Sequence, residues 1–375
     1  MNKKILHNIL LVTIALSIPL IILLSPLIKK GIVLPDYYNH LFEKAEILEI
    51  IEEEIEDDIA ITDLKIGRQV LKVKILTGKY KGNIYETVNL IEQSHNVIGK
   101  VGLKIIVGIR ETDNTQNIWV YNYNRAPYLY IMGTIFIFLL ILFGGKQGFN
   151  SMIALLFTST IFIFIMIPLI FKGYHPITLS IISVIITTIV SFLLIGGFEK
   201  KMLIAILGTT SGILVAGILS FTFSKLTHLS GINLEKGTQL VYLALDYNIQ
   251  VRGIMFSSIL IASMGAVMDV SMSISSSMYE IYQIDNTISS KTLFTTGMNI
   301  GKDIMGTMTN TLILAFMGGS LGLMLVIWGY NMSYNQLINL PFVSIEIIQG
   351  LAGSIGIVLT VPFTALMASI ILSRK

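Results

Sequence analysis

Long apolar runs, separated by short polar segments, dominate this chain from Pro127 onward. About 20 consecutive apolar residues are enough for a helix to cross the hydrocarbon core of a bilayer. Charged residues make up only 13% of the sequence, against about 25% in a typical soluble domain. We therefore expect an α-helical integral membrane bundle of about eight transmembrane helices. They are expected at residues 9–28, 127–143, 150–171, 177–196, 202–224, 253–276, 303–328 and 345–372.

The first apolar run, from Ile9 to Ile28, follows the basic start Met1-Asn-Lys-Lys4. A basic start before an apolar run is also the pattern of a cleaved secretion signal. This run is long enough to span a bilayer, and no Ala-x-Ala cleavage site accompanies it. Both features favour a retained N-terminal transmembrane anchor at residues 1–30 over a cleaved signal.

Residues 31–126 break this pattern and hold most of the charge, including an acidic run from Glu43 to Asp63. Alternating or β-branched segments, separated by turn-forming residues, predict strands near 71–75, 84–90, 103–107 and 118–123. About five short strands predict a small β-rich domain, OB-like by strand count. Residues 46–55 fit a helix equally well, because isoleucines repeat there every four residues. For the acidic run, a solvated surface is favoured over a cation site.

Basic residues near the helix ends predict the orientation, because cytoplasmic loops carry an excess of lysine and arginine. With a cytoplasmic N-terminus, nine such residues lie inside and four lie in the short outside loops. Counting the three that flank the β-rich domain changes this to nine against seven. We expect both termini in the cytoplasm, residues 31–126 on the extracytoplasmic side, and a seven-helix membrane domain at 127–375.

Small residues repeat at helical spacing in two of the expected helices: Gly208, Gly212 and Ala216 in one, and Gly350, Gly353 and Gly356 in the other. This pattern lets a second helix approach the backbone closely. We interpret all six residues as packing contacts and assign them no chemistry.

Two expected helices carry polar residues that a simple membrane anchor does not need. On helix 253–276, Asp269, Ser273 and Ser276 fall at i, i+4 and i+7 and so share one face. On helix 303–328, the same spacing recurs at Asp303, Thr307 and Asn310. An ionisable side chain inside a bilayer costs roughly 2.5–3.5 kcal/mol on insertion scales, so by default it marks a function. We therefore predict two polar core helices, each with one polar stripe.

The expected helix bounds set the expected depths of these residues. Asp269 and Asn310 each lie seven residues from the inner end of their helix, which is about 10 Å at the helical rise, so they are expected at one level. Ser273 and Thr307 are then a turn nearer to the cytoplasm, and Asp303 lies at the inner mouth. Asp269 has a second interpretation, as a buried aspartate that bonds to hydroxyls and only supports packing.

A loop expected at residues 277–302 leads into this pair of helices. Its segment Gly297-Met-Asn-Ile-Gly301 is interpreted as a flexible polar entry onto a helix N-terminus, with Asn299 as one of the contacts to an ion or substrate. Asp303 also has a second interpretation, since a carboxylate in a first helical turn is favoured by the helix dipole alone.

Two motifs carry a resemblance to a known family: Gly265-Ala-Val-Met-Asp-Val-Ser-Met-Ser-Ile274 and Gly297-Met-Asn-Ile-Gly-Lys-Asp-Ile-Met-Gly-Thr-Met-Thr-Asn-Thr-Leu-Ile-Leu-Ala315. Most of the chain, including the Tyr123-Asn-Arg125 that closes the outer domain, resembles the YibE/F-like family of bacterial multispan membrane proteins. The resemblance implies an integral protein of the bacterial cell membrane and no settled activity. A fainter likeness is to the SecD/SecF and resistance–nodulation–division permeases. They share an outer domain after the first helix and an Asp-bearing polar helix, but here helix 202–224 adds no second aspartate.

Three functions stay open at this stage. In the first, the chain is a transporter or permease, driven by an ion gradient or by a partner, in which Asp269 takes up a proton or cation. The other expected ion or substrate contacts are Ser273, Asn299, Asp303, Thr307 and Asn310. In the second, it is a non-transporting assembly or export accessory factor that acts through its outer domain. In the third, Asp269 and Asp303 form the dyad of an intramembrane aspartyl protease. Their expected depths differ by about 10 Å and no Gly-x-Gly-Asp motif is present, so we expect no enzyme.

Composition excludes or disfavours other kinds of site. The chain has no cysteine, which excludes disulfides, thiolate metal sites and cysteine catalysis. Its five histidines lack metal-ligand spacing, no Gly-x4-Gly-Lys-Ser/Thr motif is present, and the net charge of +3 does not suggest nucleic acid. We expect no cofactor and no metal. The expected partners are the lipid bilayer, an ion, a small-molecule substrate, and another membrane subunit or a second copy of this chain.

Overall fold

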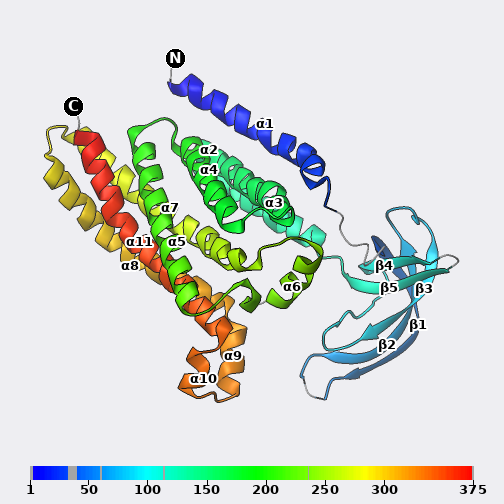
Figure 1. Ribbon diagram of the computed structural model, residues 1–375. Coiled ribbons are helices and arrows are strands. Elements are labelled where there is room, and N and C mark those ends of the chain that lie inside the picture. Colours follow the sequence, from blue (N-terminus) through cyan, green and yellow to red (C-terminus); the bar gives the residue numbers. More distant parts are fainter. Residues whose placement is uncertain (1–2, 33–39, 60, 113–114, 235, 374–375) are drawn as a thin grey trace. The chain divides into compact units, whose positions relative to one another are not determined.

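A computed structural model describes residues 3–32, 40–59, 61–112, 115–234 and 236–373 of the chain. The chain forms two compact units (Figure 1). Residues Val33–Leu139 form the first, called the β unit, and residues Met1–Ile32 with Leu140–Lys375 form the second, called the helical unit.

The β unit contains five antiparallel strands in the order β3-β2-β1-β4-β5. They are β1 (His40–Asp57), β2 (Lys65–Ile75), β3 (Ile84–Ile91), β4 (Lys104–Thr112) and β5 (Thr115–Tyr123). The prediction of about five short strands is confirmed. The alternative helix at residues 46–55 is wrong, because this segment lies inside β1 and pairs with β2.

The sheet curls because β1 changes its neighbour along its length. The end of β1 from Ala45 onward pairs with β2, while its start, up to Glu46, pairs with β4. Side chains on one face, among them Ile47, Leu71 and Ile105, are fully buried in a common core. Two side-chain hydrogen bonds link the edge strands: Tyr85 donates to Gln116 at 2.6 Å, and Thr87 donates to the Ile118 carbonyl at 2.7 Å. The result is a curled half-barrel of five strands.

The acidic run forms much of the outer surface of β1. Most of its carboxylates are exposed, and two of them make cross-strand ion pairs, Lys72–Glu49 at 3.6 Å and Lys65–Asp57 at 3.8 Å. Among the described residues, no group of three or more His, Cys, Asp or Glu is arranged to hold a metal ion. These observations favour the interpretation of the run as a solvated surface.

A buried polar network supports the β unit from inside. Gln69 is fully buried and donates to Glu53 at 2.7 Å and to the Gly99 carbonyl at 3.1 Å. Its own oxygen accepts from the Gly99 amide at 2.7 Å and from Asn89 at 3.2 Å. Asn89 also donates to the Val97 carbonyl at 2.6 Å. The network ties the irregular segment 97–99 to β2 and β3.

The helices carry the remaining described structure. In chain order they are α1 (Lys3–Lys29), α2 (Ala126–Thr160), the π-helix η1 (Ile161–Met166), α3 (Ile167–Phe171), α4 (Pro176–Gly196), α5 (Lys200–Leu226), the short 3-10 helix η2 (Gly231–Asn233), α6 (Gly237–Asp246), α7 (Val251–Ile284), α8 (Ser290–Gly319), α9 (Leu321–Gly329), α10 (Tyr334–Ile338) and α11 (Pro341–Ser373).

Six described helical segments are long and apolar enough to cross a membrane. The pair α8–α9, bent by 62° at its break, makes seven if it forms one span. The segment Ala126–Phe171 counts as one of the six, but its 46 residues are interrupted at Gly145, where φ is 51° and ψ is −128°. A Cβ on Gly148 would lie 2.0 Å from the Leu140 carbonyl oxygen, so the chain turns back sharply there. This break falls between the helices expected at 127–143 and 150–171. The number of crossings remains a prediction.

Two helices differ clearly from their expected bounds. The helix expected at 253–276 continues to Ile284, and the one expected at 303–328 begins at Ser290 and bends at Ser320. The expected loop at 277–302 is therefore wrong, since only residues 285–289 separate the two helices. This segment is rich in serine, threonine and glycine, which alone predict a loop, but its buried residues Leu293, Gly297 and Gly301 pack against neighbouring helices.

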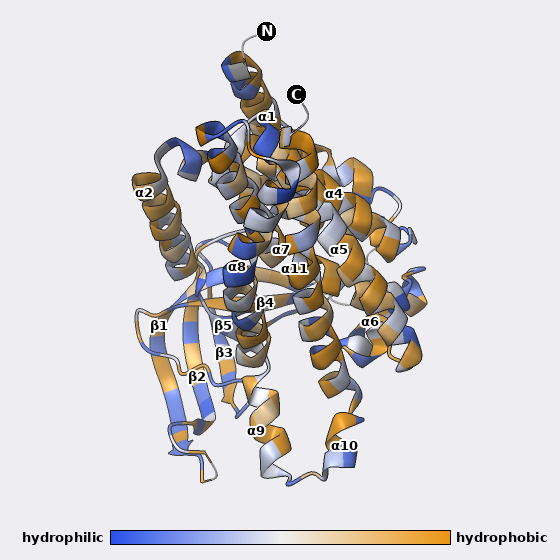
Figure 2. Ribbon diagram, turned by 90° about the vertical axis from the view of Figure 1, so that its left-hand side faces the viewer, coloured by the Kyte–Doolittle hydropathy of each residue, from blue (hydrophilic) through white to orange (hydrophobic). Residues whose placement is uncertain are grey.

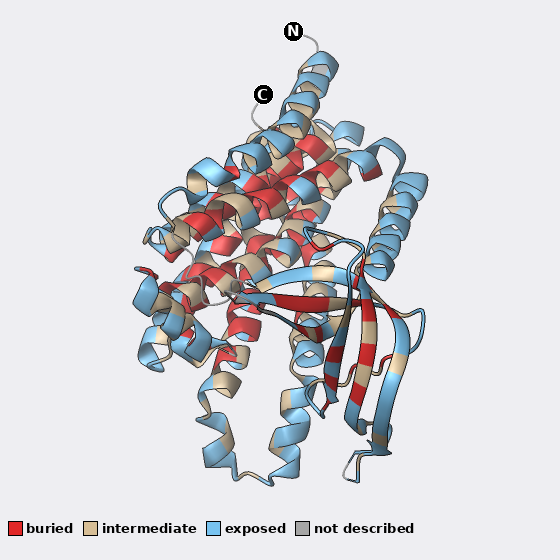
Figure 3. Ribbon diagram, turned by 90° about the vertical axis from the view of Figure 1, so that its right-hand side faces the viewer, coloured by how far each residue is buried: buried red, intermediate tan, exposed pale blue. Residues whose placement is uncertain are grey.

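Small residues set the closest helix contacts of the helical unit. On α5, a Cβ at Gly208 would lie 2.1 Å from Thr364 Oγ1, and one at Gly212 would lie 1.7 Å from Thr360 Oγ1. On α11, a Cβ at Gly356 would lie 2.9 Å from Ala216 Cβ. The packing interpretation of these positions is confirmed. The buried residues gather along the middle of the bundle, as Figure 3 shows.

A larger side chain at Gly212 should weaken the α5–α11 crossing. Gly212→Leu is expected to destabilise the helical unit by about 1–3 kcal/mol, because an overpacked interface must shift. Thermal unfolding of the full chain in detergent measures this loss. Gly306→Leu on α8 is the control, since a Cβ there meets nothing within 4 Å. An equal loss in both variants would show that Gly212 is not at a critical contact.

Removing the amide of Gln69 should unfold the β unit more easily. Gln69→Leu is expected to cost about 1–3 kcal/mol, because buried groups such as the Gly99 amide lose their partner. Fluorescence of Trp119, in a background with Trp328→Phe, reports unfolding of this unit. The matched control is Gln93→Leu, because Gln93 bonds to Asp58 at the exposed surface. A Gln69 variant as stable as this control would contradict the role of the network.

Candidate functional site

The polar residues of α7 and α8 lie on the exposed sides of these two helices, and the two sides together are here called the polar face. Its members are Asp269, Ser273, Asn299, Lys302, Asp303, Thr307 and Asn310, and each is exposed in the single chain. Figure 2 shows hydrophilic segments along α8 beside helices that are mostly hydrophobic. The expectation that these residues lie in the core of the bundle is wrong for one copy of the chain.

The opposite faces of the two helices explain this placement. On α7, the buried residues include Val267, Val270 and Ile274, which repeat at spacing three to four and enter the core shared with α11. On α8, Gly297 and Gly301 are buried at spacing four. Each helix therefore turns its apolar or small side inward, and helical geometry leaves the polar side outward.

Close contacts fix the register between α7 and α8. A Cβ on Gly301 would lie 3.2 Å from Ile274 Cδ1, and one on Gly297 would lie 2.5 Å from Met278 Sδ. Extending this antiparallel register along both helices places Ser273 level with residues 302–303, and Asp269 level with residues 306–307. The expected levels, which pair Asp269 with Asn310 and Ser273 with Thr307, are therefore wrong by about one turn. The error follows from the longer helices.

Asp303 does not lie at a helix start. It is the fourteenth residue of α8, whose N-cap is Ser289, with its hydroxyl accepting from the Thr292 amide at 3.1 Å. The capping interpretation of Asp303, and its expected place at the inner mouth, are both wrong. The expected flexible entry at residues 297–301 is also helix, and it brings Asn299 onto the polar face.

The two aspartates lie closer in level than expected. The register places Asp303 about three residues, or about 4.5 Å along the helix axis, from the level of Asp269. The depth argument against a protease dyad therefore no longer holds. The absence of a Gly-x-Gly-Asp motif still stands against it, and we assign no enzymatic role to this pair.

Lys302 is a residue of the polar face that sequence reasoning missed. The count of basic residues treats it as a loop lysine on the cytoplasmic side, but it lies inside α8 and is exposed. The inside count of basic residues thus falls from nine to eight. The sequence does indicate that Lys302 belongs to the polar face, because it follows Asn299 at spacing three and so lies on the same side of a helix. The face therefore carries charges of both signs.

Comparison with known proteins adds one result. Residues 132–374 match the family model described as YibE/F-like protein. The chain belongs to the YibE/F-like family. No curated protein and no solved structure matches it. All seven residues of the polar face lie within the matched range, whereas the strands of the β unit precede it. Family and apolar helices together indicate a membrane protein. The likeness to SecD/SecF and resistance–nodulation–division permeases stays an expectation.

Paired cysteines test the α7–α8 register of this YibE/F-like chain. The combination Ser273→Cys with Asp303→Cys is expected to be cross-linked by a short bismaleimide, because both positions are exposed at one level. Mass spectrometry of peptides measures the link, and the absence of native cysteine removes background. Ser273→Cys with Asn310→Cys is the comparison, since Asn310 lies about 10 Å further along α8 than Asp303 does. Preferential linking of this second pair would contradict the register.

Proposed function

We propose that this chain is a multipass transporter or permease whose translocation path follows the polar face of α7 and α8. The observation that carries the proposal is that residues of both signs lie exposed, at matching levels, near the middle of two apolar helices. By its rise, α7 is about 51 Å long, well beyond the hydrocarbon core of about 30 Å. Asp269 is 18 residues from one end and 15 from the other, so a bilayer centred on α7 contains it.

Direct contact with acyl chains is a poor environment for this face. Charged residues in a bilayer are expected to face a water-filled cavity or other protein, and they mark ion and substrate paths. The polar face has two aspartates, one lysine and several amide and hydroxyl groups within a few helical turns. A water-lined path along this face accounts for all of these polar side chains together. Packing of α7 and α8 against the other helices does not, because it needs only the buried residues on the opposite sides of the two helices.

The side chains suggest distinct roles along the path. Asp269 is the proposed site of proton or cation uptake, because its titratable carboxyl group is exposed on the polar face near the middle of α7. Asn299 and Asn310 supply amide groups that contact a substrate. The Thr307 hydroxyl donates to the Ile304 carbonyl at 2.9 Å, so its oxygen remains an acceptor. Lys302 and Asp303 carry opposite charges. They lie about one helical turn nearer than Asp269 to residues 285–289, which connect α7 and α8.

The proposed location is the cytoplasmic membrane of a bacterial cell. Both termini and the turn at residues 285–289 are proposed to face the cytoplasm, and the β unit the opposite side. Lysines at the proposed cytoplasmic ends support this orientation, including Lys146, Lys200 and Lys291. No energy-supplying nucleotide motif is present in the sequence, so an ion gradient is the proposed source of energy.

A second function has an observation in its favour. Because the polar face is uncovered in one chain, it also fits a non-transporting assembly or export accessory factor. In that case a polar helix of another membrane subunit would cover Asp269 and its neighbours, and the β unit would bind an extracytoplasmic partner. The two functions differ in whether the isolated chain moves ions.

Proton flux in proteoliposomes under an imposed pH gradient tests the transport proposal. Asp269→Asn is expected to reduce the flux to the protein-free background, because asparagine keeps the size and hydrogen bonding of aspartate but cannot titrate. Asp246→Asn is the control, since Asp246 is exposed at the end of α6, outside the apolar spans. It should transport as the unmodified chain does.

Expression and thermal unfolding of all three proteins verify that each is folded. Equal flux through the unmodified chain and Asp269→Asn would remove Asp269 as the coupling residue. Absence of flux above background through the unmodified chain would favour the accessory function instead.

A further inference from the structure

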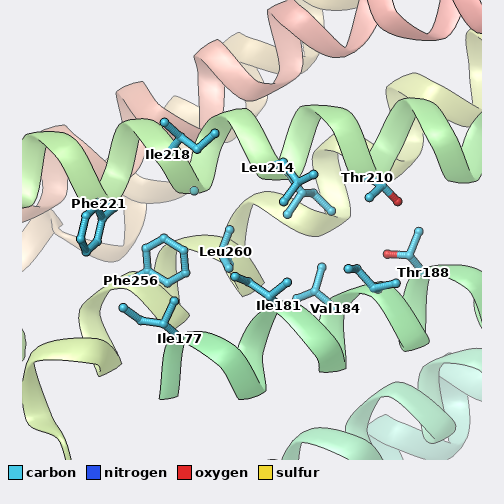
Figure 4. A pocket seen from close by; sticks show the side chains of 13 residues that line it. Ile177, Ile181, Val184, Thr188, Thr210, Leu214, Ile218, Phe221, Phe256 and Leu260 are labelled. Atoms are coloured by element: carbon cyan, nitrogen blue, oxygen red, sulfur yellow. The ribbon is translucent and has the colours of Figure 1, made fainter. Parts of the chain in front are cut away.

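An apolar groove runs along the outside of the helical unit between α4 and α5, with α7 as its floor. Its cavity volume is ≈ 230 Å³. Figure 4 shows Ile177, Phe221 and Phe256 at one end, and Thr188 and Thr210 at the other. The stretch of α5 between Thr210 and Phe221 is about 16 Å long, which is close to half of the thickness of a hydrocarbon core of about 30 Å. The groove therefore has the length of one leaflet.

A basic pocket of ≈ 830 Å³ lies at the Phe221 end of this groove. Four side chains that carry or can take up a positive charge line it: His175, Lys225, His228 and Arg252. Among the described residues that line the pocket, none is acidic. Lys225 lies in the last turn of α5 and Arg252 in the first turn of α7, so the charges come from different helices and converge on one cavity.

Two helix N-termini add to this positive potential. Both α4 and α7 begin at the pocket, and a Cβ on Gly253 would lie 3.2 Å from Pro176 Cβ, so their first turns are in contact. Their N-cap residues, His175 and Gln250, make no side-chain capping bond. The positive end of each helix dipole attracts anions. Arg252 in such a first turn opposes the helix dipole, and an anion would relieve that repulsion.

The pocket and the groove form one continuous amphipathic site. Ile177, Phe221 and Phe256 line both cavities. A ligand that fits has an anionic head and an apolar tail of about one leaflet's length. A free phosphate would use the pocket and leave the groove empty, whereas a neutral lipid would fill the groove and leave the positive charges unpaired.

We propose that this site binds an anionic phospholipid, with its phosphate headgroup in the basic pocket and one acyl chain in the α4–α5 groove. Lysine and arginine side chains form charge-assisted hydrogen bonds with phosphate groups. The proposal goes beyond transport, because it uses no residue of the polar face and requires only that the helices lie in a membrane.

Quenching of tryptophan by brominated lipids tests the site in the full chain. The reporter chain carries Phe221→Trp together with Trp119→Phe and Trp328→Phe, so its one tryptophan lies in the groove. Brominated phosphatidylglycerol is expected to quench this reporter at a several-fold lower fraction of lipid than brominated phosphatidylcholine does. A chain that keeps only Trp328, an exposed residue of α9, is the reference for ordinary lipid contact and should show no preference.

Charge and tail are tested separately. Lys225→Gln with Arg252→Gln should abolish the preference of the groove reporter, while Lys81→Gln with Lys100→Gln, which removes the same charge from the exposed surface of the β unit, should keep it. Excess glycerol phosphate should not relieve the quenching, because it lacks a tail. Equal quenching of the groove reporter by the two lipids, survival of the preference without Lys225 and Arg252, or displacement by glycerol phosphate would each overturn the proposal.

Discussion

The close approach of α11 to its neighbours is the contact on which the helical unit depends. Gly212 and Gly356 bring α5 and α11 together until backbone oxygens limit further approach. Gly301 on α8 leaves space for the side chain of Val361 on α11, whose Cγ1 lies 2.1 Å from where a Cβ on Gly301 would be. Van der Waals packing of small residues is the main source of helix association where lipid surrounds the protein. Once these faces are buried, the remaining sides of α7 and α8 must face outward.

The polar face follows from that constraint. Asp269 and Asp303 are exposed because Val270 and Gly301, on the other sides of the same helices, are needed in the core. The chain thus presents a charged surface along apolar helices, which a lipid-facing position would disfavour. Water along a transport path, or another subunit, accounts for this surface. The α4–α5 groove is different, since its lining is apolar and only its end is basic.

Periodicity in the sequence was enough to predict four of the five strands, most apolar helices and the packing glycines, but it did not locate β1, where isoleucines at spacing four also fit a helix. It failed where local residue preference and tertiary packing disagree. Residues 277–302 are rich in serine, threonine and glycine and so predict a loop, yet contacts such as Gly297 with Met278 hold most of them in helices. Because the helix bounds were predicted wrongly, the expected levels of the polar residues along α7 and α8 were wrong, and Lys302 was assigned to a loop. Whether a polar stripe faces the core or the outside also depends on neighbouring helices, which one helix's spacing does not specify.

Transport along the polar face requires that this face is in contact with water inside the bilayer. A spin label at Ser273→Cys, in the full chain in liposomes, tests it by electron paramagnetic resonance with two relaxing agents. We predict that a water-soluble nickel chelate relaxes this label more than oxygen does, while a label at the exposed Leu314 of α8 shows the opposite order. Stronger relaxation by oxygen at Ser273 would place the face in lipid, and low accessibility to both agents would place it against protein. Either result would contradict a water-lined path.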